Sequence, residues 1–151
     1  MSTFTTADIE RLSTLLSDEY ELYKKIHKQT EEQTELLNKD DIEAFNASLD
    51  KREKLIEQIK GLHQESAPLM QSYVSFTSGG KNYIKEIDRL KKQIREELEF
   101  SGKLNETNIE TMKNKTEEHT KRIDEQSAKR KGIGGYAQSV PNTPEVFDRK
   151  T

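Results

Sequence analysis

Three histidines are the side chains of this sequence best suited to bind a metal ion or to transfer a proton near neutral pH. They are His27, His63 and His119, and they lie far apart along the chain. A metal site on a helix places two ligands three or four residues apart and adds further histidines, cysteines or carboxylates. We therefore interpret the three histidines as solvated side chains on helix surfaces, and we expect no bound metal.

Paired carboxylates and one glycine-rich stretch are the remaining candidates for catalysis. The carboxylates occur in the stretches EELEF and TEEHT. General acid–base catalysis needs a desolvated cleft that shifts the pKa of a carboxyl group, and a slim helical protein offers little of one. The stretch TSGGKNY lacks the spacing of a phosphate-binding loop. The sequence therefore predicts that the protein is not an enzyme and uses no cofactor.

The composition favours a thin helical protein over a compact enzyme. Of 151 residues, 30% are hydrophobic and 35% are charged, whereas globular domains are nearer half apolar. The 25 basic and 28 acidic residues are interspersed, which disfavours nucleic-acid binding. Cysteine is absent, the first residues do not resemble a secretory signal, and no apolar run is long enough to cross a membrane. We expect a cytoplasmic protein that does not insert into the membrane.

Apolar residues recur every three or four positions over three long segments, as in amphipathic helices. The segments span about residues 6–38, 41–76 and 81–131. They predict an all-α fold, an elongated antiparallel three-helix bundle or coiled coil with a long third helix. We expect this bundle to occupy residues 1–131 and a flexible C-terminal tail to occupy residues 132–151.

Local signals mark the expected helix ends. Thr5 and Asp8 fit a capping box at the start of the first helix, and Asp40 is placed to cap the second. Gly79 and Gly80 tolerate the left-handed backbone that ends helices, so we expect the second helix to stop before them.

The apolar positions of the third segment advance in steps of eleven residues along two columns. One column is Ile87, Leu98 and Ile109, and the other is Leu90, Ser101, Met112 and Ile123. Such a step suits a nearly straight helix. Because the third helix is longer than its partners, we expect Ile109, Met112 and Ile123 to be half exposed. Either a partner protein or a second copy of the chain would cover them.

The C-terminal residues combine helix-breaking residues with aromatic side chains. Pro141 and Pro144 favour an extended backbone, and disordered tails are typically poor in aromatic residues. Tyr136 and the pair Val146 and Phe147 therefore resemble short anchors for a partner.

Taken together, the segments resemble the flagellar type III export chaperones of the FlgN family, which serve the hook–filament junction proteins. The resemblance rests on a leading IERLSTLLSDEYELY, a second helix DDIEAFNASLDKREKLIEQIKGL, and a third helix with NETNIETM. A glycine-flanked tyrosine and a terminal FDRKT complete it. It covers essentially the whole length, as organisation more than identity.

This resemblance implies a function without catalysis. Such chaperones bind C-terminal helices of the junction proteins in the cytoplasm, prevent premature assembly and deliver this cargo to the membrane export apparatus. The implied cargo-binding residues are Leu104, Asn105, Asn108, Ile109, Met112, Thr116 and Ile123. Tyr136 is implied to dock on the cytoplasmic domain of the export-gate membrane component.

Two alternative functions stay open at this point. One is another flagellar or type III coiled-coil component, such as a filament-cap chaperone or the stalk protein of the export ATPase. The other is a structural protein that self-associates through the third helix, and a homodimer without cargo is compatible with either.

Overall fold

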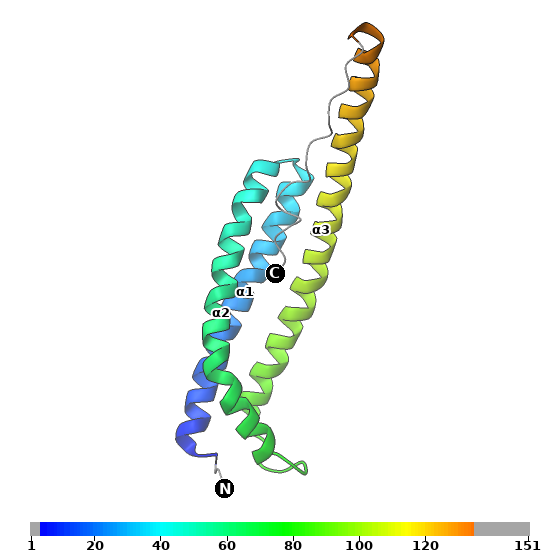
Figure 1. Cartoon of the computed structure of the whole chain (residues 1–151). Helices are drawn as coiled ribbons and strands as arrows, with labels where there is room; N and C mark the ends of the chain where they lie inside the picture. Colours follow the sequence, from blue (N-terminus) through cyan, green and yellow to red (C-terminus); the bar gives the residue numbers. More distant parts are fainter. Residues whose placement is uncertain (1–3, 135–151) are drawn as a thin grey trace.

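The computed structural model describes residues 4–134, with side chains described as far as residue 126. This part of the chain forms three helices and no strand (Figure 1). They are α1 (Thr6–Asn38), α2 (Ile42–Phe76) and α3 (Lys85–Gly134). The predicted all-α bundle with a long third helix is confirmed. The tail residues Tyr136, Val146 and Phe147 lie outside the described range.

The start of α1 confirms the predicted capping box. The Thr5 hydroxyl accepts a hydrogen bond from the Asp8 backbone N–H at 3.1 Å. In return the Asp8 carboxylate accepts from the Thr5 backbone N–H at 2.9 Å. Two backbone donors at the helix start are thereby satisfied.

The cap of α2 is Asp41, so the expected cap Asp40 was wrong by one residue. Asp41 Oδ1 accepts from the Ala44 backbone N–H at 3.1 Å. Asp40 instead has φ of 57° and turns the chain between α1 and α2. A short polar side chain tolerates this left-handed conformation better than most, and this suits Asp40 to the turn.

The turn between α2 and α3 is longer than predicted, so α3 begins at Lys85 and not near residue 81. Gly79 and Gly80 have φ of 81° and 78°, and Asn82 has φ of 62°, so none of them can continue a helix. The Tyr73 hydroxyl accepts a hydrogen bond from the Ile84 backbone N–H at 2.9 Å, which fixes the entry into α3. At its other end α3 continues to Gly134, beyond the expected residue 131.

The three helices run up, down and up, so α1 and α3 are parallel and α2 is antiparallel to both. Figure 1 shows α1 crossing behind α2, and α3 extending well past the turn between α1 and α2. α1 packs along both α2 and α3, whereas α2 and α3 make little close backbone contact with each other. α2 runs on through Pro68, and Figure 1 shows it changing direction in its lower part.

The core consists of two apolar clusters. The lower cluster lies near the α2–α3 turn, and its buried members are Phe4, Leu12, Leu16, Tyr73, Ile87 and Leu90. The upper cluster lies near the α1–α2 turn and is formed by Leu37, Phe45 and Met112. Between these clusters the buried positions are mostly polar. We call this part the polar layer; it comprises Gln29, Thr30, Gln33, Arg52, Ser101 and Asn108.

Only one of the two predicted columns of α3 faces α1. Leu90, Ser101 and Met112 are buried, as expected for the packed side of the helix. In the other column Ile87 is buried, but Leu98 and Ile109 are 49% and 47% exposed. The prediction that Leu98 belongs to the packed seam was therefore wrong, because the seam passes through Glu97, Ser101, Leu104 and Asn108.

Candidate functional site

The face of the bundle between α2 and α3, opposite α1, has no helix on it among the described residues, and we call it the open face. From α2 it receives a column of residues spaced seven apart and mostly half-buried. These are Ile42, Leu49, Ile56, His63 and Met70. From α3 it receives the exposed apolar residues Leu98 and Ile109, which are eleven residues apart and so lie on one side of the helix. One groove, lined by all three helices, lies on this face. A second groove lies where α3 passes the α1–α2 turn.

The lower groove of the open face has a volume of about 290 Å³ and lies between all three helices. Leu16, Glu19 and Tyr23 of α1 form its floor, and Met70 and Leu98 stand on its α2 and α3 walls. Apolar surface dominates this lining. An exposed Leu98 beside Met70 is a favourable site for an apolar side chain from a partner, because covering it removes apolar area from water.

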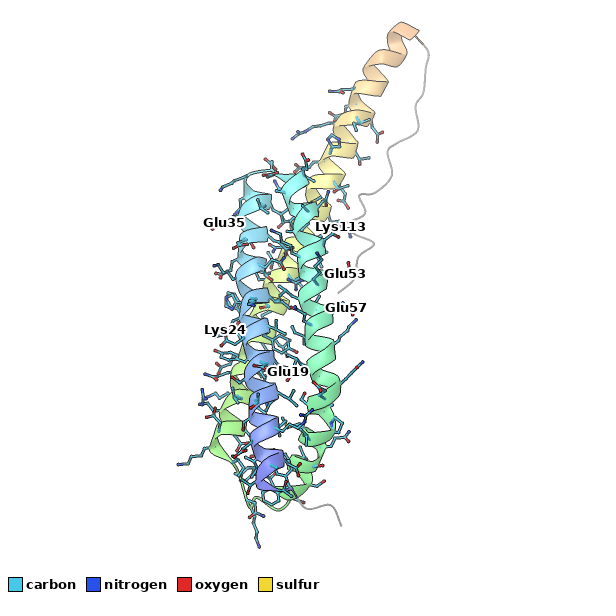
Figure 2. All side chains as sticks on the ribbon, turned by 90° about the vertical axis from the view of Figure 1, so that its left-hand side faces the viewer. Glu19, Lys24, Glu35, Glu53, Glu57 and Lys113 are labelled. Atoms are coloured by element: carbon cyan, nitrogen blue, oxygen red, sulfur yellow. The ribbon has the colours of Figure 1, made fainter. Side chains whose placement is uncertain are left out.

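A buried carboxylate lies in the floor of the lower groove. Glu19 is 3% exposed and accepts a hydrogen bond from the Ser66 hydroxyl at 3.0 Å, and His63 Nδ1 lies 3.5 Å from the same oxygen. Burial raises the pKa of Glu19, although Ser66 and His63 oppose this shift. In Figure 2 Glu19 lies between α1 and α2, whereas Lys24 and Glu35 project away from the bundle.

The Tyr23 hydroxyl shares this environment. Burial raises the pKa of Tyr23, and the Glu19 charge adds to the shift. Both effects penalise the ionised phenol, so Tyr23 stays a neutral hydrogen-bonding group at physiological pH.

The upper groove lies where α3 passes the α1–α2 turn, and its volume is about 590 Å³. Ile42 and Met112 supply apolar surface, and Thr116, His119 and Arg122 continue the lining along α3. An ion pair between Lys115 and Asp40 ties α3 to the turn. Beyond this point α3 has no neighbouring helix in the described part of the chain.

The polar layer connects the two walls of the open face. Arg52 Nη1 of α2 donates to the Thr30 hydroxyl at 2.7 Å, and Asn108 Nδ2 of α3 donates to the Thr30 carbonyl at 3.1 Å. The Asn108 side-chain oxygen accepts from the Thr34 hydroxyl at 2.8 Å. Thr30 of α1 is therefore hydrogen-bonded to one residue of α2 and to one residue of α3.

Several atoms of this layer lack a partner. Within the described part of the chain, the buried atoms without a hydrogen bond are Gln29 Oε1, Arg52 Nε and Ser101 Oγ. Burial lowers the pKa of the Arg52 guanidinium. A buried polar group without a partner is costly, so the layer is the least satisfied part of the bundle.

The residues implied to bind cargo divide into two groups. Ile109 is exposed on the open face, and Leu104, Asn105, Thr116 and Ile123 are half-buried. Asn108 and Met112 are each 2% exposed, so the expectation that Met112 is half exposed was wrong. Met112 packs against Leu37 and Phe45, and Asn108 is hydrogen-bonded to α1.

His27 is not the solvated side chain that we expected, whereas His63 is exposed on the surface of α2, with 68% of its side chain accessible. His27 Nδ1 lies 2.5 Å from Glu97 Oε2, and its ring stacks on Phe100 with the centroids 4.1 Å apart. His63 contacts the buried Glu19. The described residues contain no group of three side chains placed to hold a metal ion.

Sequence reasoning missed Arg52 and Leu98 as residues of the site. A signal for Arg52 is present in the sequence, because it belongs to a column of α2 residues spaced seven apart. That column is Phe45, Arg52, Ile59, Ser66 and Tyr73, and every member is buried. A single arginine among such positions indicates a buried charge.

Comparison with protein-family models, curated proteins and solved structures finds no match for this chain. Among the described residues, no helix combines the length and the apolar character needed to span a membrane.

Proposed function

We propose that this protein is a non-catalytic, helix-binding chaperone of the flagellar type III export kind. In this proposal it binds C-terminal helices of hook–filament junction proteins in the cytoplasm. It prevents their premature assembly and delivers them to the export gate. The bound helix lies on the open face and turns the three-helix bundle into a four-helix bundle.

The observation that carries the proposal is the arrangement of apolar residues on the open face. α2 and α3 each present half-buried or exposed apolar side chains toward a groove that neither helix closes. Amphipathic helices bind such grooves through residues at helical spacing. In a four-helix bundle each helix packs along two neighbours, whereas here α2 and α3 make little close backbone contact with each other.

The identity of the cargo rests on the resemblance described above. Junction proteins fit the site because the resemblance implies that their C-terminal segments are helical. Docking on the export gate is assigned to Tyr136, which follows α3 in the sequence. The pair Val146 and Phe147 is a candidate second anchor.

The binding surface is tested with two aspartate substitutions on the open face, Leu98→Asp and Ile109→Asp. Each adds a charge at an exposed position, so we expect normal folding and loss of junction-protein capture. Tyr83→Asp is the matched control, because Tyr83 is 59% exposed in the α2–α3 turn, away from both grooves. Cargo retained at wild-type affinity by both open-face variants would refute the assignment of this surface.

Copurification distinguishes the alternative partners. Capture of junction proteins supports the proposal, whereas capture of the filament-cap protein or an export ATPase subunit supports another type III component. A tight dimer in light scattering that persists when cargo is added supports a self-associating structural protein. A pull-down with the full chain and with a chain that lacks residues 132–151 distinguishes the cargo-binding surface from the gate-docking tail. We expect the shortened chain to lose the export gate and to retain the cargo.

A further inference from the structure

The wall that α3 contributes to the lower groove is basic. Lys91 is half-buried and Arg95 is exposed, and both line the groove. Neither forms an ion pair with another described residue. Arg95 is three residues before Leu98 and Lys91 is seven, which places them about 5 Å and about 10 Å from it along the helix axis, toward the α2–α3 turn. The groove therefore combines an exposed apolar residue with two nearby cations.

The carboxylates of the other two helices leave these charges unpaired. Glu19 is the one carboxylate among the described residues that line the groove. It lies in the floor, is 3% exposed, and accepts a hydrogen bond from Ser66. On α2, Glu65 pairs with Arg11 of α1 at 3.2 Å and does not line the groove. A partner that enters the groove therefore meets the two cations of α3 at its mouth.

The apolar pair of the C-terminal tail, Val146 and Phe147, cannot reach this groove. Phe147 lies outside the described residues and follows Gly134, the last residue of α3, by thirteen positions. An extended chain of that length spans at most about 47 Å. Leu98 precedes Gly134 by 36 residues, which is about 54 Å along the axis of α3. The residue that covers Leu98 therefore comes from another molecule.

The charges also disfavour a second copy of the chain in the symmetric arrangement that homodimers normally adopt. A two-fold interface places the same surface of both copies in contact. Two copies joined through the lower groove would therefore bring Lys91 and Arg95 of each copy close to one another. Like charges facing each other across an interface oppose association. The charges of the groove favour a different protein that supplies negative charge.

We propose that the helix bound in the lower groove belongs to another protein and carries an acidic residue beside its apolar anchor. The anchor covers Leu98 and Met70, and the glutamate or aspartate contacts Lys91 and Arg95. The acidic residue is three to seven positions from the anchor on the same face of the bound helix, on the side nearer the α2–α3 turn. The proposal rests on the helix-binding part of the proposed function, and it adds the charge pattern of the partner.

The physical basis is a division between affinity and selectivity. Covering Leu98 and Met70 removes apolar area from water and supplies most of the affinity. An exposed pair between a carboxylate and Arg95 is weak by itself and is screened by salt. Lys91 is half-buried, so salt screens its pair less. We therefore expect the charges to determine which helices bind and in which position, more than whether a helix binds at all.

The test uses three synthetic amphipathic helices of about 25 residues as probes for the full chain. All carry leucine at the inward positions except one, four residues from the central leucine, which is Glu, Gln or Lys. Fluorescence anisotropy measures binding at concentrations at which each peptide alone is monomeric. We expect the Glu peptide to bind at least tenfold tighter than the Lys peptide at low salt, and less so at high salt. The net charge of the chain is -3, so overall charge would favour the opposite order.

The matched variants reverse single charges on α3. Lys91→Glu and Arg95→Glu change the lining of the groove, so we expect each to weaken the preference and the double variant to bind the Lys peptide best. Lys92→Glu is the control, because Lys92 is exposed, adjacent to Lys91 and absent from the lining. We expect this control to keep the order of the wild type. Circular dichroism and thermal denaturation confirm that each variant is folded.

The outcomes separate this inference from the proposed function. An unchanged order of the peptides for the double variant, or equal effects of Lys91→Glu and Lys92→Glu, would overturn the inference. If the three peptides bind equally and Leu98→Asp abolishes that binding, the helix-binding proposal stands and the acidic partner is wrong. If none binds, the helix-binding proposal fails and the inference fails with it. A dimer of the free chain that Leu98→Asp dissociates would identify a second copy as the occupant and would also overturn the inference.

Discussion

Met112 and Ile109 show how sharply the environment changes within one turn of α3. They are three residues apart and both apolar, yet Met112 is 2% exposed and Ile109 is 47% exposed. Met112 completes the upper cluster with Leu37 and Phe45, whereas Ile109 stands on the open face. The first residue therefore contributes to stability, and the second is available for binding.

Aspartate substitution separates these two roles. We expect Met112→Asp to lower the free energy of unfolding by about 3–5 kcal/mol, because it places an unpaired charge in a packed cluster. We expect Ile109→Asp to change it by less than about 1 kcal/mol. Urea denaturation followed by circular dichroism measures both. Equal losses of stability would mean that Ile109 is packed in solution.

Glu19 makes the stability of the folded protein depend on pH. Burial raises its pKa above the ordinary value of 4.5, so between 4.5 and the raised value the folded protein binds more protons than the unfolded one. The contribution of Glu19 to stability is therefore largest below pH 4.5 and declines as the pH rises through this window. The groups facing Glu19 are Ser66, His63 and Tyr23.

Glu19→Gln removes this dependence and keeps an oxygen that accepts the Ser66 hydrogen bond. We expect the variant to match the wild type near pH 4 and to become the more stable protein toward pH 7. The difference should amount to about 1.4 kcal/mol for each pH unit of the window. Denaturation between pH 4 and pH 8 measures it, with Glu35→Gln as an exposed control. A pH-independent difference would contradict the assignment.

The polar layer shows why single residues were harder to predict than their spacing. Thr30 and Gln33 occupy seam positions of α1 and are buried, although a sequence pattern treats them as a polar gap. Their burial depends on Ser48, Arg52 and Asn108, which bring partners from α2 and α3. The sequence specifies that these side chains can hydrogen-bond, but only the packed helices decide with whom.

At the scale of the elements, local signals predicted most helix ends. The Thr5 capping box and the end of α2 before Gly79 depend on neighbouring residues alone, and both were predicted. The start of α3 was not, because it depends on the Tyr73 hydroxyl, which reaches the Ile84 backbone across the turn. Asp40 and Asp41 are chemically equivalent as caps, and only the backbone distinguishes them.

The α2–α3 turn offers a matched pair of glycine substitutions. Gly79 has φ of 81°, so we expect Gly79→Ala to destabilise the protein by about 1 kcal/mol. Gly61 lies inside α2, and an added methyl group would meet nothing within 4 Å. We expect Gly61→Ala to stabilise the protein by about 0.5–1 kcal/mol. Thermal denaturation compares them, and a stabilising Gly79→Ala would show that the turn differs from this conformation.

Among the predictions about the helices, the main one that the structure corrected was which side of α3 faces α1. Both eleven-residue columns fit a helix, and periodicity cannot tell which column a neighbour covers. Glu97, Ser101 and Asn108 occupy the packed side because His27 and Thr30 of α1 bind two of them. Leu98 and Ile109 are turned to the open face as a result. The polar contacts of α1 therefore determine which apolar residues of α3 are left for a partner.

At the scale of the whole molecule, α1 makes close backbone contact with both other helices, whereas α2 and α3 meet mainly through side chains of the two apolar clusters. Figure 1 shows α3 continuing beyond the α1–α2 turn, where Lys115 pairs with Asp40. The helix extends about 28 Å from there to Gly134. A single helix of this length without tertiary packing is marginally stable in water. The bundle therefore combines a packed central helix with a third helix that is supported over only part of its length.

Amide hydrogen exchange tests this division. In the isolated protein we expect slow exchange for residues 87–112 of α3 and exchange at least a hundredfold faster for residues 120–134. Binding of a helix on the open face should slow exchange in α2 and α3. Residues 12–26 of α1 include the floor of the lower groove but already pack against both other helices, so we expect their exchange to slow less than that of α2 and α3. Equal slowing in all three helices would indicate that binding stabilises the bundle as a whole. Slow exchange beyond residue 120 in the free monomer would show that this part of α3 is already packed.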